Sequence, residues 1–201
     1  MTLRRGLLWG LLVAALLAVA AAALFQRLSR PAAPPVLGEV PDFALTNRDG
    51  RPVRLADLSG TPWVADFVFT RCPASCPMLT ARMARLLRDL PKDDPVRFVS
   101  FSVEPDHDTP EVLQKYAESF SAPDHWLFLT GTREQIRSLT VEGFKLGLEM
   151  TPPPGMSFPE PILHSTRFVL VDGEGRIRGY YEAFDEESMK RLEADLRALA
   201  P

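Results

Sequence analysis

Cysteine is scarce in this chain of 201 residues, which contains two, Cys72 and Cys76. Two cysteines cannot build the disulfide framework that stabilises many small exported domains. A close, isolated pair is instead typical of a redox site or a metal site. Histidine is almost as rare, with three residues, His107, His125 and His164. Any metal site must therefore draw on a short set of candidate ligands.

An excess of positive charge is also lacking. The chain carries 23 Lys and Arg against 26 Asp and Glu, for a net charge of −3. Nucleic-acid binding needs a basic domain with clustered Lys and Arg, so we exclude a nucleic-acid partner. Hydrophobic residues make up 46% of the sequence, enough for a sizeable core. The length suits one ordinary domain with an appendage.

The appendage is an uncharged apolar run, Gly6–Phe25. In a helix, ~20 residues span about 30 Å, the thickness of the bilayer core. Arg4 and Arg5 precede the run, which predicts a cytoplasmic N-terminus and an exported domain. A cleaved signal peptide is the competing interpretation, because Ala20–Ala23 offers small residues for cleavage. The absence of a cysteine near Phe25 excludes a lipid anchor at that point.

These features divide the chain into three segments. Residues 1–25 are the predicted membrane anchor or signal peptide, and residues 26–38 are a proline-rich linker. Residues 39–201 form the predicted domain. We expect a single-pass protein of the cell inner membrane whose domain faces the periplasm or the outer side.

Within the domain, strand-like and helix-like patterns alternate. Strands are expected at 43–45, 52–55, 63–70, 96–103, 126–129, 165–171 and 176–181. Helices are expected at 73–90, 110–120 with Thr109 as its cap, 132–139 and 185–199. Alternation of this kind predicts an α/β domain with a mixed sheet flanked by helices. The pattern suits a thioredoxin-like fold, although other α/β folds share it.

The cysteine pair lies where the strand at 63–70 gives way to the helix at 73–90. Unpaired backbone N–H groups and the helix dipole at such a junction favour thiolate. Cys76 follows Cys72 by four residues, so we expect it one helical turn along the same face. Dithiol oxidoreductases commonly use C-x-x-C, and the extra residue here leaves room for an ion between the sulfurs.

The ligand inventory narrows the choice of metal. Two thiolates favour Cu(I), Zn or an iron–sulfur cluster. A cluster normally needs four protein ligands, and structural zinc here would need two histidines. Copper accepts two sulfurs and one nitrogen, and therefore fits best. The alternative is that the cysteines are two small, buried, inert residues.

His164 is the candidate third ligand. It directly precedes the strand at 165–171 and follows a proline-rich loop at 151–161. Ligands in α/β sheets gather near strand ends, and long irregular loops are commonly functional. His107 and His125 lie in polar loops, where we expect them to be solvated.

Asp66 interrupts the apolar strand that leads to Cys72. One interpretation is an exposed or hydrogen-bonded residue on an edge strand. The other is a partly buried carboxylate that tunes the protonation of the thiols without binding metal.

Four stretches of the chain resemble the SCO/SenC family of copper proteins: residues 63–77, 102–111, 126–131 and 164–172. The resemblance covers residues 39–199. It implies a thioredoxin fold and copper, as Cu(I) or Cu(II), bound by Cys72, Cys76 and His164. It also implies a role in building the dinuclear copper centre of cytochrome c oxidase, with subunit II of the oxidase as partner.

Three functions compete. The first is a copper metallochaperone, not an enzyme, that serves this dinuclear site and is gated by a disulfide between Cys72 and Cys76. A periplasmic thiol reductant would then reopen the pair. The second is a membrane-tethered thiol-disulfide reductase for oxidase cysteines, which would not need His164. The third, a peroxide reductase, is weakest, because peroxiredoxins carry threonine where this chain has Phe69.

Overall fold

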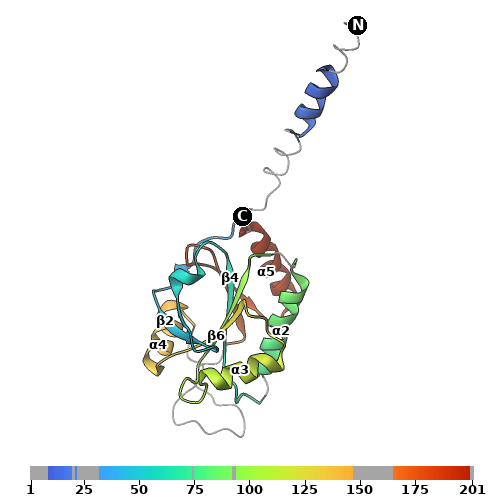
Figure 1. Cartoon of the computed structure of the whole chain (residues 1–201). Coiled ribbons are helices and arrows are strands. Elements are labelled where there is room, and N and C mark those ends of the chain that lie inside the picture. The colour runs from blue at the N-terminus through green and yellow to red at the C-terminus, as the bar shows by residue number, and fades with distance from the viewer. Residues whose placement is uncertain are drawn as a thin grey trace. The chain divides into compact units, whose positions relative to one another are not determined.

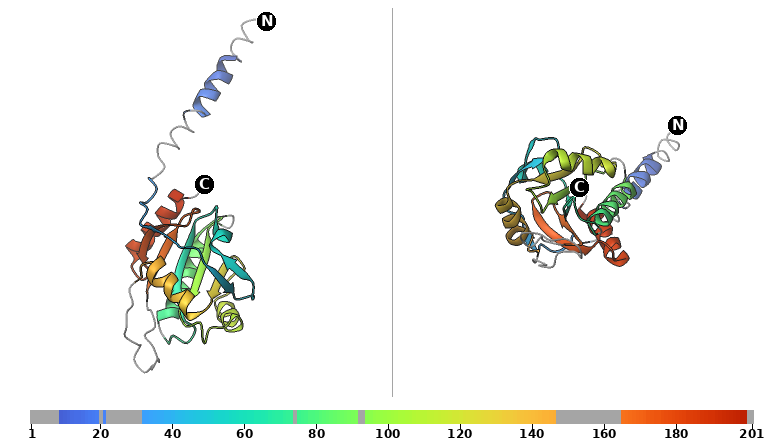
Figure 2. Two further views of the ribbon diagram at one scale, coloured as in Figure 1. Left: turned by 90° about the vertical axis from the view of Figure 1, so that its left-hand side faces the viewer. Right: turned by 90° about the horizontal axis from the view of Figure 1, so that it is seen from below.

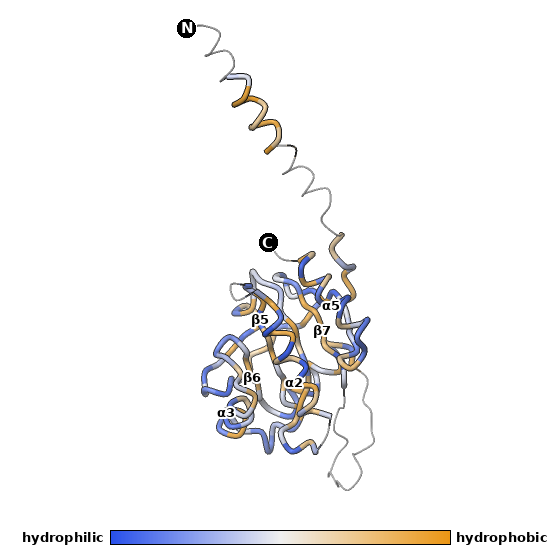
Figure 3. The backbone as a smooth tube through the Cα atoms, turned by 90° about the vertical axis from the view of Figure 1, so that its right-hand side faces the viewer, coloured by the Kyte–Doolittle hydropathy of each residue, from blue (hydrophilic) through white to orange (hydrophobic). Residues whose placement is uncertain are grey.

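A computed structural model of the chain describes residues 9–19, 21, 32–73, 75–91, 94–146 and 165–199. The chain divides into two units, Met1–Ala33 and Pro34–Pro201. In the first unit, residues 9–19 are helical and mostly hydrophobic (Figure 3). The predicted span Gly6–Phe25 lies partly outside the described residues. Within the ranges described, no helix combines the length and the apolar character needed to cross a membrane.

The second unit contains an eight-stranded mixed sheet with helices on both sides (Figures 1 and 2). Its strands are β1 (Gly38–Glu39), β2 (Ala44–Asn47), β3 (Pro52–Arg54), β4 (Trp63–Val68), β5 (Arg97–Ser102), β6 (Trp126–Thr130), β7 (Arg167–Val171) and β8 (Arg176–Glu182). Its α-helices are α2 (Ser75–Asp89), α3 (Pro110–Ser119), α4 (Arg133–Ser138) and α5 (Glu186–Leu199). A 3₁₀ turn spans Leu55–Leu58, and a π-helical turn, Leu139–Gly143, extends α4.

The strand order is β1-β8-β7-β4-β5-β6-β2-β3. Strands β4, β5 and β6 are parallel neighbours, and every other pairing in the described sheet is antiparallel. Strand β4 therefore lies in the middle of the sheet, with parallel β5 on one side and antiparallel β7 on the other. The carboxyl end of β4 and the amino end of β7 consequently meet at the same edge of the sheet.

Two hydrophobic layers cover the two faces of the sheet. Val64 and Val68 of β4 belong to the layer that includes residues of α2, α3 and α5. Trp63, Ala65 and Phe67 face the opposite layer, which includes residues of α4 and its π-helical extension. Successive side chains of a strand point to opposite faces of the sheet, and both faces of β4 are covered. Every position of β4 is therefore buried, which explains its nearly uninterrupted apolar sequence.

The predicted α/β fold with a mixed sheet and flanking helices is confirmed. Helix α3 begins where its signals place it: Pro110 is its first residue, and the Thr109 hydroxyl accepts a hydrogen bond from the N–H of Val112 at 3.4 Å. Helix α2 begins at Ser75, two residues later than predicted. Strand β1 was not predicted, because two residues are too short to show a strand pattern.

Candidate metal centre

Both cysteines lie in the connection between β4 and α2. The backbone N–H of Cys72 donates to the carbonyl of Phe69 at 3.2 Å, which forms a turn directly after the strand. Because α2 begins at Ser75, Cys72 precedes the helix, while Cys76 belongs to its first turn. Cys72 thus lies at the predicted strand-to-helix junction, and Cys76 lies within the helix that follows.

The sulfur of Cys72 is nevertheless held at the start of the helix. It accepts a hydrogen bond from the backbone N–H of Cys76 at 3.3 Å and lies 3.3 Å from the hydroxyl of Ser75. The first N–H groups of a helix have no partner within the helix, so the sulfur satisfies one of them. The two cysteines are not joined by a disulfide. The fold thus brings the sulfur of one cysteine to the backbone of the other.

Burial dominates the electrostatics of Cys76. Cys72 is 5% exposed and Cys76 is 4% exposed. Burial raises the pKa of the Cys76 thiol well above its usual value, and a hydrogen bond with the backbone of Phe69 offsets only part of this effect. The charges of Cys72 and Asp66 raise this pKa further. At Cys76, desolvation therefore outweighs the stabilisation of thiolate that a helix start provides.

Thr80, one turn further along α2, makes a second polar contact with the first turn of the helix. The hydroxyl of Thr80 donates to the carbonyl of Cys76 at 2.9 Å and lies 2.8 Å from the hydroxyl of Tyr116 on α3. Burial raises the pKa of Tyr116, so its hydroxyl stays protonated near neutral pH. This contact links the cysteine-bearing turn to the neighbouring helix.

Asp66 is not on an edge strand, and that interpretation is wrong. It lies at the centre of β4, is 0% exposed, and pairs in register with Ser100 of β5. No described residue makes a hydrogen bond of normal geometry to its carboxylate oxygens. Burial raises its pKa to about 7, although the nearby Ser100 hydroxyl works in the opposite direction. The Ser100 hydroxyl itself accepts from the indole N–H of Trp126 at 3.0 Å.

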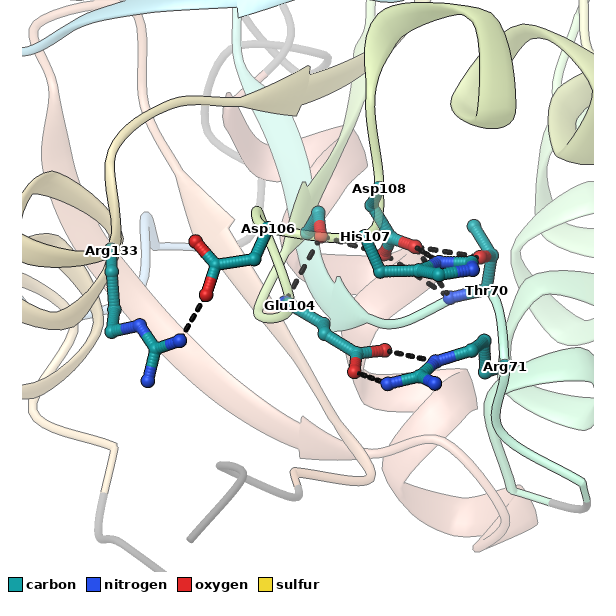
Figure 4. A network of polar contacts seen from close by, with 8 residues as sticks. Thr70, Arg71, Glu104, Asp106, His107, Asp108 and Arg133 are labelled. Atoms are coloured by element: carbon teal, nitrogen blue, oxygen red, sulfur yellow. Dashed lines mark hydrogen bonds and ion pairs between the residues drawn. The ribbon is translucent and has the colours of Figure 1, made fainter. Parts of the chain in front are cut away.

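Beside the cysteine loop lies a polar network that the sequence did not indicate (Figure 4). At its centre is Asp108, in the loop between β5 and α3, with an exposure of 0%. Its carboxylate accepts from the Thr70 hydroxyl at 2.6 Å, from the Thr70 backbone N–H at 3.2 Å, and from the Ser102 hydroxyl at 2.7 Å. The carboxylate thus joins residues at the ends of two adjacent parallel strands.

Two ion pairs border this centre. The guanidinium of Arg71 donates two hydrogen bonds to the carboxylate of Glu104, one to each oxygen (Figure 4). Arg133 of α4 forms an ion pair with Asp106 (Figure 4). Arg71 directly precedes Cys72, so this contact also restrains the cysteine loop. A short-range sequence pattern cannot reveal these pairs, because their partners lie more than twenty residues apart.

Among the described residues, one group of side chains is close enough together to hold a metal ion. Potential ligand atoms of Glu104, His107 and Asp108 lie within 4.8 Å of one another. Each of the two carboxylates already has protein partners, and the Nδ1 of His107 lies 3.0 Å from Asp108. His107 was predicted to be solvated, but its side chain is only 39% exposed and is held by Asp108. His125 is exposed, as predicted.

His164 lies outside the described residues, as does the proline-rich loop that precedes it. The described chain resumes at Ser165 and enters β7, which pairs antiparallel with β4. Its assignment as a ligand therefore stays a prediction.

Comparison with known sequences identifies relatives over most of the chain. Residues 34–200 match the sequence model of the SCO1/SenC family. A SCO1 protein homolog of Bacillus subtilis is 33% identical over 167 residues, which are 82% of this chain and 84% of that protein. A putative copper-binding protein of Stutzerimonas stutzeri is 30% identical over 146 residues, covering 72% of this chain and 69% of that protein.

Solved structures agree with the sequence relatives. A SCO1/SenC family lipoprotein from Bacillus anthracis is 33% identical, with a TM-score of 0.72 over 84% of this chain and 99% of that chain. BsSco, a member of the Sco family of cytochrome c oxidase assembly proteins in which a disulfide switch was identified, is 30% identical with a TM-score of 0.69, covering 85% and 98%. Bradyrhizobium japonicum ScoI with copper bound is 26% identical with a TM-score of 0.65, covering 78% and 98%.

The family match spans most of the chain, the SCO1 homolog of Bacillus subtilis aligns along most of its own length, and the thioredoxin-like fold is the one those structures share. The chain therefore belongs to the SCO1/SenC family.

Proposed function

We propose that this protein is a copper metallochaperone that binds copper through Cys72, Cys76 and His164 and delivers it to the dinuclear copper site of cytochrome c oxidase, through subunit II. The observation that carries the proposal is the pair of reduced cysteines at the β4–α2 junction, where the sulfur of Cys72 accepts a hydrogen bond from the backbone N–H of Cys76. Copper is the cargo of this reaction. Thiolate sulfur suits Cu(I), and an imidazole nitrogen adds affinity for Cu(II).

The position of His164 in the sequence supports its role as third ligand. It precedes Ser165 by one residue, and the described chain from there leads into β7. Strand β7 runs antiparallel to β4, so its amino end lies at the edge of the sheet where β4 ends and the cysteine loop begins.

The protein's own groups perform two tasks during copper binding. Each thiol must lose its proton to become a ligand, so loading releases protons. The nearly complete burial of both cysteines keeps water from the sulfurs and limits their oxidation by small molecules. Asp66 tunes the thiols without binding copper, because its charge opposes ionisation of Cys76.

The same thiols support redox gating. Oxidation of Cys72 and Cys76 by thiol exchange with an oxidant's disulfide transfers two protons and two electrons to that oxidant, which becomes a dithiol, and leaves no thiolate for copper. A periplasmic dithiol reductant, becoming a disulfide itself, would return both and restore binding. The disulfide switch of BsSco favours this extension. It also favours the second candidate function, a thiol-disulfide reductase that acts on oxidase cysteines.

The proposed location is the cell inner membrane, with residues 1–25 as a single-pass anchor or signal peptide, residues 26–38 as linker, and residues 39–201 as the exported copper-binding domain. Support comes from the uncharged run Gly6–Phe25 behind Arg4 and Arg5.

Copper titration of the reduced full-length protein tests the proposal. We expect one copper per chain, loss of binding in Cys72→Ser and Cys76→Ser, and a sulfur-to-copper charge-transfer band for Cu(II) that changes in His164→Ala. His125→Ala is the matched control, because His125 is also a histidine but is exposed. If His164→Ala and His125→Ala both keep the wild-type spectrum, the histidine is not a ligand. If the protein reduces disulfides but binds no copper, the reductase is the better proposal.

A further inference from the structure

We propose that Asp108 is a positioning residue that holds the cysteine loop in its dithiol arrangement and thereby sets the equilibrium between the dithiol and disulfide forms of Cys72 and Cys76. The proposal extends the redox part of the proposed function to a residue in a different loop.

The carboxylate of Asp108 is buried, and both of its oxygens have hydrogen-bond partners. It receives the hydroxyl and the backbone N–H of Thr70, the hydroxyl of Ser102, and the Nδ1 side of His107. Hydrogen bonds to an ionised carboxylate are stronger than those between neutral groups. A buried carboxylate with this many donors makes a rigid connection between the chain after β4 and the chain after β5.

This connection reaches the sulfur through three consecutive restraints. Asp108 accepts hydrogen bonds from the backbone N–H and from the side-chain hydroxyl of Thr70, and so restrains both. Arg71, the next residue, is held by Glu104 from the same loop as Asp108. Cys72, the residue after that, is fixed by its turn hydrogen bond to Phe69. The loop thereby presents the Cys72 sulfur to the start of α2.

In that position the sulfur is stabilised as a hydrogen-bond acceptor. It takes the N–H of Cys76 at 3.3 Å and lies beside the Ser75 hydroxyl. A disulfide requires the two sulfurs to approach to about 2.05 Å with a defined dihedral angle, which a restrained loop resists. Loosening the loop should therefore favour the disulfide. Asp108 thus biases the pair toward the open, thiol form.

The test is a metal-free redox titration of the full-length protein in detergent with reduced and oxidised dithiothreitol. In each turnover, the two cysteines lose two protons and two electrons, and oxidised dithiothreitol gains them. Thr70→Val removes the hydroxyl that donates to Asp108 and keeps the shape of the side chain, while Thr70→Ser keeps the hydroxyl. Asp108→Asn weakens the same hydrogen bonds from the other side.

We expect the equilibrium constant for disulfide formation to rise about tenfold in Asp108→Asn and in Thr70→Val, a shift of about 30 mV toward more negative potential. Thr70→Ser should stay close to wild type. The double variant should shift little more than either single variant, because both changes break the same connection.

The control for general destabilisation is Asp172→Asn. Asp172 is also a buried carboxylate, 5% exposed, but it binds Arg176 and Arg178 in the β7–β8 hairpin. It should lower the free energy of unfolding without a shift in potential. A wild-type potential in Thr70→Val, a shift to less negative potential, or an equal shift in Asp172→Asn would each overturn the proposal. Because no copper is present, failure of copper binding leaves this result intact.

Discussion

Asp66 faces Ser100 across the β4–β5 pairing, and within the described structure its carboxylate oxygens receive no hydrogen bond of normal geometry. A fully buried carboxylate in this state is ionised only at a cost. Its pKa of about 7, against an ordinary value of 3.8, measures that cost. This relationship gives the first prediction.

The stability of the protein should fall as the pH rises from about 4 to about 7. The folded-state pKa of Asp66 is raised, so the folded state binds a proton in this range that the unfolded state has lost. Stability is greatest below the unfolded pKa and declines until the pH passes the folded pKa. The loss attributable to Asp66 is on the order of 4 kcal/mol. Cys76 and Tyr116 stay neutral here, because burial raises both pKa values.

Denaturant unfolding of wild type and Asp66→Asn across this pH range measures the effect. The variant should show a smaller decline, because asparagine does not ionise. Equal slopes for both proteins would show that Asp66 does not titrate in this range.

Copper binding should strengthen with pH. The raised pKa of Cys76 means that its thiol is protonated near neutrality, so each copper bound must displace that proton. The apparent Cu(I) affinity should rise about tenfold per pH unit for this proton alone. Competition with a chromophoric chelator at several pH values, corrected for the chelator's own titration, provides the measurement. A flat profile would mean that both sulfurs are already ionised.

Tyr116→Phe should affect the cysteine turn. The Tyr116 hydroxyl is the partner of Thr80, which donates to the carbonyl of Cys76. We expect a loss of about 1 kcal/mol in the free energy of unfolding and faster alkylation of Cys76 in the native protein. Tyr180→Phe is the matched control, because its hydroxyl donates to the carbonyl of Phe144 at 2.9 Å in the opposite layer. It should lower stability similarly and leave the alkylation rate unchanged.

Orientation in the membrane is tested with protease added to spheroplasts. The uncharged run behind Arg4 and Arg5 predicts that the domain is accessible from outside and is lost from the membrane fraction. Protection of the domain until the cells are lysed would reverse the orientation.

The sequence by itself determined the local elements, because their signals are local. The apolar pattern of β4, the Thr109–Pro110 start of α3, and the alternation of strands with helices all predicted elements that the structure contains. It also predicted a site at the cysteines, because a close isolated pair at a strand-to-helix junction is visible in the sequence. His164 was chosen on the same kind of evidence and stays a prediction.

Tertiary structure alone decided the surroundings of the cysteines. Strand order placed Asp66 at the centre of the sheet, because β7 from the far end of the chain covers one side of β4 and β5 covers the other. Desolvation then raised the pKa of Cys76, against the expectation from its helix position. Thr70 and Asp108 are 38 positions apart and meet only because adjacent parallel strands end at the same edge. No periodicity encodes such a contact, since its energy comes from burial and from donors supplied by several loops.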